Sequence, residues 1–228
     1  MRVLRGRAAD IEADRAVTRA LCADTAETGR RAVRVWTPHR QVAFGRRDAR
    51  EPGYDRARET AREHGFAPYE RSVGGRAVAY TGSTVAFARV EGLDDVREGL
   101  DARYEAMTGD VTRALERLGV AVEAGEPPAS FCPGDHSLQA EGKVVGIAQR
   151  VQRGAALTAG ICVTDDRAAL AAVLEDVYAA LDVPFDPESV GSVARAAGRT
   201  VDPGDVVEAI ERALVGAAEA RVERIEGR

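Results

Sequence analysis

The segment from Leu93 to Leu118 carries one apolar stripe at helical spacing, and this stripe limits the folds open to the chain. Apolar side chains recur there at every third or fourth position: Val96, Leu100, Tyr104, Met107, Val111, Leu115 and Leu118. This spacing places all of them on one face of an α-helix. Because such a face must be covered by other apolar surface, we expect the helix to pack on a β-sheet.

The segments on both sides of this helix predict the strands of that sheet. Runs typical of strands are "RAVRVW", "QVAFG", "APYERS", "RAVAY", "STVAFARV" and "SLQAEGKVVGIAQRVQRGAALTAGICV". Further helices are expected over residues 9–28, in "YDRARETAREHG", and over about 166–181 and 205–219. We therefore predict an α+β fold, in which residues 1–228 form a single domain of mixed β-sheet flanked by helices.

Composition excludes several classes of protein. A chain of 228 residues suffices for one sizeable core but is short for two full domains. The net charge of -5, without a basic stripe, gives no sign of nucleic-acid binding. No apolar signal core or membrane-spanning run is present, so we expect a cytoplasmic protein without a membrane partner. The three widely spaced cysteines predict neither a disulfide framework nor a metal site.

Lys143 is the only lysine among the 32 lysines and arginines of the chain. Drift from lysine to arginine stops where a compact, strongly hydrated charge must reach one oxygen atom and a guanidinium cannot replace it. Lys143 lies at the start of a predicted strand, directly after the turn at Gly142. It is therefore a candidate for chemistry, and an incidental solvated lysine is the alternative.

The stretch "ERSVGGRAVAYTG", residues 70–82, is a second candidate. Two adjacent glycines between Arg71 and Arg76 allow a ligand to approach the backbone closely, with guanidinium groups facing its anionic part. A hairpin with solvated arginines is the alternative.

Three blocks in the chain resemble a known family. "RSVGGRAVAY" resembles the RRxxGGGxVxH segment of lipoate-protein ligases and octanoyltransferases. "GKVVGIAQRVQRGAALTAGICV" resembles their GKKIxGSAQ stretch and the strand after it, and "RVWTPHRQVAFGRRDA" resembles their entrance strands. The resemblance implies the biotin/lipoate ligase-like catalytic fold, with a core over about 30–165, a helical C-terminal part over about 166–228, and no separate accessory domain.

The resemblance also implies a set of site residues. Lys143 matches the family's active-site lysine, which stabilises charge on the acyl carbonyl or phosphate oxygen. The other matched positions are expected to bind substrate: Arg71, Ser72, Gly74, Gly75, Arg76, Tyr80, Gly146, Ala148, Gln149 and Thr158. Four positions depart from the family's motifs: Glu70 and Arg76 replace an arginine and a glycine, and Tyr80 and Thr158 replace histidines.

The implied reaction attaches a lipoyl or octanoyl group to one lysine of a lipoyl domain or of a glycine-cleavage H protein. By the ligase route, lipoate, ATP and Mg²⁺ give an acyl-adenylate, which the acceptor lysine then attacks. The biotin-ligase branch is disfavoured because its glycine- and arginine-rich loop is absent.

Cys132, in "SFCPGDHSL", raises the alternative of an octanoyltransferase, in which octanoyl-acyl carrier protein gives the acyl group either to Cys132 or directly to the acceptor. Cys132 precedes Lys143 by eleven positions, in a turn-rich loop. One branch of octanoyltransferases holds the acyl group as a thioester on a cysteine in such a loop, so the resemblance implies that Cys132 could do the same. His136 or nearby arginines could promote its thiolate. A structural role for this thiol stays open.

Two further alternatives concern partners. Many ligases of the family carry an accessory domain, and the stretch after "TAGICV" is short for one. We therefore expect a transferase, a single-domain ligase, or a ligase whose accessory part is a separate subunit. A noncatalytic member that binds lipoylated or acylated proteins would suit the changes at Tyr80 and Thr158, but retention of Lys143 disfavours it.

Overall fold

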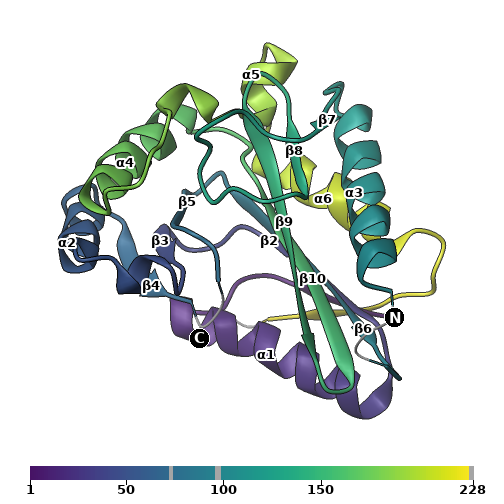
Figure 1. Cartoon of the computed structure of the whole chain (residues 1–228). Helices are drawn as coiled ribbons and strands as arrows, with labels where there is room; N and C mark the ends of the chain where they lie inside the picture. The colour runs from purple at the N-terminus through teal and green to yellow at the C-terminus, as the bar shows by residue number, and fades with distance from the viewer. Residues whose placement is uncertain (72–73, 96–98, 226–228) are drawn as a thin grey trace.

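The computed structural model describes residues 1–71, 74–95 and 99–225, and Figure 1 shows their arrangement. The helices and strands, in chain order, are β1 (Arg2–Arg5), α1 (Ile11–Thr28), β2 (Ala32–Trp36), β3 (Gln41–Phe44), η1 (Asp48–Arg50), α2 (Tyr54–Glu63), β4 (Ala67–Glu70), β5 (Val78–Tyr80), β6 (Val85–Gly92), α3 (Leu100–Arg117), β7 (Glu123–Ala124), β8 (Ser137–Gln139), β9 (Lys143–Gln152), β10 (Ala155–Cys162), α4 (Arg167–Ala180), η2 (Pro187–Ser189), α5 (Val193–Ala197), α6 (Pro203–Val215) and β11 (Arg221–Arg224).

The strands form two mixed sheets. The larger sheet has the order β11-β1-β2-β6-β10-β9-β8-β7, and the smaller has the order β4-β3-β5. In the larger sheet β1 runs parallel to β2 and β11, and the other neighbours are antiparallel. Successive side chains of a strand point to opposite faces, so the larger sheet offers both faces to helices. This is the predicted α+β domain of mixed sheet flanked by helices.

The helices α3 and α6 cover one face of the larger sheet (Figure 1). Met107, Val111 and Leu115 of α3 are fully buried in one cluster with Phe87 of β6 and Val145 of β9. The predicted apolar stripe therefore packs on a sheet, and burial of this face supplies much of the core.

The opposite face of the larger sheet packs on α1 at one end, where Leu21 and Cys22 contact Ala32 and Ala155. The smaller sheet, α2 and α4 enclose another core cluster, which includes Phe44. Figure 1 shows α2 and α4 together beside β3, β4 and β5. The loops that carry the candidate site run between these two parts of the fold.

A buried ion pair fixes α1 to β2. The Arg34 guanidinium is fully buried and contacts the Asp14 carboxylate, while Trp36 Nε1 donates to Asp14 Oδ2 at 2.8 Å. Arg34 also lies over the Trp36 ring, 4.0 Å from its centroid. These contacts satisfy charges that would otherwise be costly to bury.

The structure corrects the predicted elements in two places. Helix α3 begins at Leu100 rather than Leu93, and Val96 of the predicted stripe lies outside the described residues. The C-terminal part is not purely helical, because β11 pairs in parallel with β1 at the edge of the larger sheet. "RVER" and "RVLR" are short and half charged, so neither shows the apolar alternation by which strands are predicted.

None of the helices within the described residues has the length and apolar character needed to cross a membrane.

The buried pair gives a test of the fold. We expect Asp14→Ala to lower the free energy of unfolding by about 3–5 kcal/mol, because it leaves the Arg34 charge buried without a partner. Urea unfolding followed by fluorescence of Trp36, the single tryptophan, measures this. Glu27→Ala, at an exposed position of the same helix, should leave the urea midpoint unchanged. Equal midpoints for both variants would contradict the proposed role of the pair.

Candidate active site

The backbone of Lys143 is fixed by a tight contact between two chain segments. Lys143 follows Gly142, whose φ is 117°, and its carbonyl accepts from the Gly191 N–H at 3.0 Å. A Cβ added at Gly142 would lie 2.6 Å from the Gly191 nitrogen, so a side chain does not fit. The turn therefore requires glycine, and it starts β9 at a defined point.

A β-bulge sets the direction of the Lys143 side chain. Gln139 of β8 pairs with Lys143, while the neighbouring Leu138 pairs with Val145, so Val144 is the extra residue. The extra residue shifts the alternation of side chains by one position, so that Lys143 points to the same face of the sheet as Gly146 instead of the opposite one. Lys143 consequently lies next to Gly146, where an added Cβ would be 3.4 Å from Lys143 Cε.

The ammonium group of Lys143 is buried and fully coordinated. Its Nζ donates to Glu126 Oε2 at 2.7 Å, to the Phe131 carbonyl at 2.9 Å and to the Cys132 carbonyl at 3.0 Å. Lys143 is 1% exposed, and Nζ also lies 4.9 Å from the centre of the Phe131 ring. Since an ammonium has three N–H donors, all are engaged by the protein.

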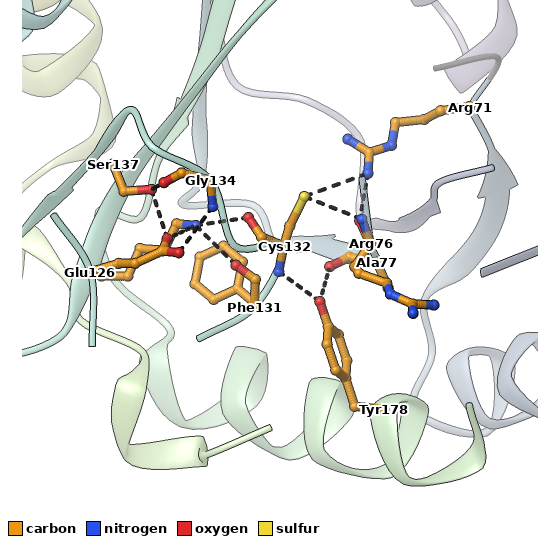
Figure 2. Close-up of polar contacts among 10 residues, drawn as sticks. Arg71, Arg76, Ala77, Glu126, Phe131, Cys132, Gly134, Ser137 and Tyr178 are labelled. Atoms are coloured by element: carbon orange, nitrogen blue, oxygen red, sulfur yellow. Dashed lines mark hydrogen bonds and ion pairs between the residues drawn. The ribbon is translucent and has the colours of Figure 1, made fainter. Parts of the chain in front are cut away.

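Glu126 joins both ends of the loop that carries Cys132. Its Oε1 accepts from the Gly134 N–H at 3.0 Å, and its Oε2 accepts from Ser137 Oγ at 2.8 Å as well as from Lys143. Figure 2 shows these contacts meeting on one carboxylate. The residue that neutralises Lys143 therefore also closes the loop.

The backbone of Cys132 is held in an uncommon conformation. Its φ is 40°, and Ala129 in the same loop has a φ of 51°. The Cys132 N–H donates to the Tyr178 hydroxyl at 2.7 Å, and that hydroxyl donates to the Ala77 carbonyl at 3.0 Å. Burial raises the pKa of Tyr178, so the hydroxyl keeps its proton. Positive φ in residues other than glycine costs free energy and persists where surrounding contacts impose it.

The Cys132 sulfur points at the glycine-containing turn between β4 and β5 (Figure 2). Sγ accepts from the Arg76 N–H at 3.4 Å and lies 4.0 Å from Arg71 Nη2. A Cβ at Gly75, whose φ is 91°, would lie 3.0 Å from Sγ. The sequence predicted that a ligand approaches the backbone at the two glycines. In the structure the sulfur of Cys132 lies close to one of them, Gly75.

Gly75 is packed from its other side by Gly45, which follows β3. A Cβ at Gly45 would lie only 2.1 Å from the Gly75 carbonyl oxygen. Gly74, in contrast, is exposed with open space around it. The glycines at 45 and 75 therefore form the support against which the cysteine sulfur rests.

The two arginines of the turn differ in their contacts. The Arg76 guanidinium reaches Glu51 Oε1 at 2.7 Å and Asp48 Oδ1 at 3.4 Å, so it faces carboxylates of the protein. Arg71 Nη2 donates to the Arg76 carbonyl at 2.5 Å and stays beside the sulfur. Ser72 lies outside the described residues.

The remaining predicted residues divide between the two faces of the larger sheet. Gly146 and Ala148 share the face of Lys143, and Ala148 is exposed. The Gln149 side chain instead contacts α3, accepting from Arg103 Nε at 2.8 Å. Thr158 pairs directly opposite Gln149 in β10 and shares its face. Both side chains therefore point away from Cys132 and Lys143.

Tyr80 and His136 are the last two residues of the predicted site, and only the contact of His136 differs from the expectation. Tyr80, at the end of β5, is half buried, and burial raises its pKa. His136, considered as a promoter of the Cys132 thiolate, stacks on Tyr104 of α3, with ring centroids 3.5 Å apart. The sulfur is contacted by Arg71 and Arg76 instead.

Glu126 and Tyr178 contact the site residues but were not predicted from the sequence. Glu126 is one of many acidic residues and precedes two prolines, and Tyr178 occupies an apolar helical position. Their contacts join segments 8 to 101 residues apart, so no local pattern marks them.

Residues 10–215 match the family described as the lipoyl protein ligase A/B catalytic domain. The chain belongs to this family. The resemblance seen in the sequence is thereby confirmed.

Two curated relatives are acyltransferases by name. An octanoyl-[GcvH]:protein N-octanoyltransferase of Exiguobacterium sibiricum is 37% identical over 166 residues, which cover 70% of this chain and 59% of the relative. A lipoyl-[GcvH]:protein N-lipoyltransferase of Listeria monocytogenes is 27% identical over 150 residues, covering 64% of this chain and 53% of the relative. The matched part thus spans less than two thirds of these relatives.

A lipoate-protein ligase A bound with ATP has the same fold. It superposes with a TM-score of 0.77 and 21% identity, covering 99% of this chain and 88% of that one. The predicted ligase-like catalytic fold is confirmed, while a likeness at this identity carries no function by itself.

The three cysteines differ in burial, and this difference predicts which of them reacts with an alkylating reagent. Cys22 and Cys162 are buried, and burial raises the pKa of Cys162 to about 12 and also raises that of Cys22. Iodoacetamide at about pH 8 should therefore modify Cys132 alone in the folded protein. Intact mass and peptide mapping measure this, with Cys132→Ser as the unmodified control and urea exposing every thiol. Modification of Cys22 at the same rate would contradict this assignment.

Proposed function

We propose that this protein transfers an octanoyl or lipoyl group to a lysine of a lipoyl-domain protein through a thioester on Cys132. The observation that carries the proposal is the placement of the Cys132 sulfur, between two N–H donors and a glycine that leaves it room. The names of the relatives support it, since they describe acyl transfer from a glycine-cleavage H protein to another protein.

In the proposed first step the Cys132 thiolate attacks the carbonyl carbon of the donor, an acylated lysine of a glycine-cleavage H protein. A carbon–sulfur bond forms, the amide carbon–nitrogen bond breaks, and the donor lysine leaves as an amine after it takes a proton. In the second step the amine of the acceptor lysine attacks the thioester and releases the Cys132 thiolate. The result is a new amide on the acceptor, with no change of oxidation state.

The oxygen of each tetrahedral intermediate needs hydrogen-bond donors. The Arg76 N–H and the Arg71 guanidinium are the donors nearest the sulfur. Donors that are already in position stabilise such an oxyanion most effectively. Lys143 has no N–H left over in this arrangement, so in the proposal its first task is to hold the carbonyls of the loop.

The ligase route through an acyl-adenylate is the second candidate, favoured by the fold shared with an ATP-bound lipoate-protein ligase. It requires positive groups for the phosphates of ATP and ligands for Mg²⁺. In this chain Lys143 and Arg76 are paired with protein carboxylates. The pairing of both cations with carboxylates favours the transfer route.

The proposal is tested by the intact mass of an apo lipoyl-domain acceptor. We expect an octanoyl increment when the protein and octanoylated glycine-cleavage H protein are supplied without ATP. Cys132→Ser should lower this transfer by about 10³-fold or more, because it removes the nucleophile. Cys22→Ala, a change in the core far from the loop, should retain it.

Two other arms distinguish the alternatives. Octanoyl-acyl carrier protein replaces the donor in one, and lipoate with ATP and Mg²⁺ replaces it in the other. An increment seen only with ATP, and unaffected by Cys132→Ser, would contradict the transfer proposal and support the ligase. A binder without activity would give no increment in any arm.

Two glycines provide a matched pair of variants. Gly75→Ala should lower the transfer rate about tenfold or more, because its methyl group would displace the Cys132 sulfur and small displacements of a nucleophile are costly. Gly82→Ala, at an exposed glycine with open space between β5 and β6, should transfer at the rate of the parent. Equal rates for the two variants in the same mass assay would mean that the contact with Gly75 does not position the sulfur.

A further inference from the structure

We propose that Glu126 is a positioning residue, which holds the loop of Cys132 in its reactive arrangement by acting through Lys143, Gly134 and Ser137. The catalytic part of this inference rests on the proposed function, because it takes Cys132 as the nucleophile. The geometric part is independent of any reaction and can be measured separately.

The Glu126 carboxylate closes the loop that carries Cys132. Glu126 stands at the start of the segment 126–137, and it contacts Gly134 and Ser137 near its end at 3.0 and 2.8 Å. Its side chain is 17% exposed. Cys132 lies between these anchor points. Figure 2 shows these contacts. Moving the carboxylate would therefore detach the start of the segment from its end and free the part that carries the sulfur.

All three N–H groups of Lys143 are engaged by Glu126 and the Cys132 loop. One is taken by Glu126, and the other two hold the carbonyls of Phe131 and Cys132. The Lys143 side chain is 2% exposed, so Glu126 supplies the charge that makes a buried ammonium tolerable. Without that carboxylate a buried ammonium at this place is costly, so the Lys143 side chain is expected to move toward water. The carbonyls of Phe131 and Cys132 then lose their donor.

The backbone of the loop is strained at two residues. The φ values of Ala129 and Cys132 are 51° and 40°, and such backbone conformations persist only where contacts impose them. Tyr178 holds the N–H of Cys132, and Lys143 holds its carbonyl. Glu126 orients Lys143, so it controls one of the two contacts that fix the backbone of Cys132.

Because the chain has a single lysine, the effect of Glu126 on the Lys143 ammonium can be measured directly. Lysine labelled with ¹⁵N at Nζ gives one labelled ammonium, that of Lys143. We expect its N–H signal in the parent protein at neutral pH, because the group is buried and hydrogen-bonded. In Glu126→Gln, hydrogen exchange of this signal should be about tenfold faster or more, since the ammonium loses its charged partner. Glu123→Gln, the same change at an exposed residue three positions earlier, should leave the exchange rate unchanged.

The catalytic part is measured by two reactions of the same sulfur. We expect Glu126→Gln to form the octanoyl adduct on Cys132 about tenfold or more slowly at saturating donor, since misplacement of a nucleophile lowers kcat. Alkylation by iodoacetamide, which needs no positioned carbonyl, should change less than about threefold. Glu126→Asp keeps the charge and should recover part of the acylation rate. A purely structural role would lower acylation and alkylation together, in step with the folded fraction.

Ser137→Ala keeps the test decisive if Glu126→Gln does not fold. It removes only the hydroxyl bonded to the carboxylate, so we expect a smaller change in the same direction for both exchange and acylation. Unchanged exchange and acylation in Glu126→Gln, or in Ser137→Ala if the first variant is unfolded, would overturn the inference.

Failure of the proposed function gives a different pattern. The parent protein would then form no adduct on Cys132, while faster ammonium exchange in Glu126→Gln would still support the control of Lys143 by Glu126. Unchanged exchange would overturn that control whatever the reaction is.

Discussion

The contact between the Lys143 ammonium and three oxygen atoms is the interaction on which the candidate site depends. Removing an ammonium from water is costly, and the cost is offset only when the charge is paired and every N–H has an acceptor. The Glu126 carboxylate and the carbonyls of Phe131 and Cys132 meet that requirement. A guanidinium is larger and presents five donors in a planar fork, so arginine would not fit the same three acceptors. This accounts for a lysine at this one position in a chain that otherwise uses arginine.

The second constraint is the narrow space between the glycine-containing turn and the cysteine loop. Gly45 lies against Gly75, and Gly75 lies against the Cys132 sulfur, so side chains at either glycine would separate the two loops. The smaller sheet positions Gly45 and Gly75, while Lys143 and Tyr178 position Cys132. The smaller sheet and Tyr178 belong to one core cluster, while β9, which starts at Lys143, contributes to the other, so both cores contribute to the geometry of the site.

Much of the fold follows from periodicity, and the site follows from it only in part. The stripe on α3 and the alternation in β2, β6 and β10 predict elements that the structure contains. The resemblance to the family singled out Lys143 and the glycine turn as site residues, and in the structure both contact Cys132. The faces of Gln149 and Thr158 could not be predicted, because the bulge at Val144 reverses the facing after Lys143. Glu126 and Tyr178 contribute through contacts between distant segments, for which the sequence has no local pattern.

A crystal structure of the protein trapped with an octanoyl group on Cys132 tests the central claim most directly. The account predicts that Lys143 Nζ still contacts Glu126 and the carbonyl of Cys132, and that the thioester oxygen lies within hydrogen-bonding distance of the Arg76 N–H. A trapped adduct in which Lys143 has left Glu126 and the loop has left Gly75 would contradict it.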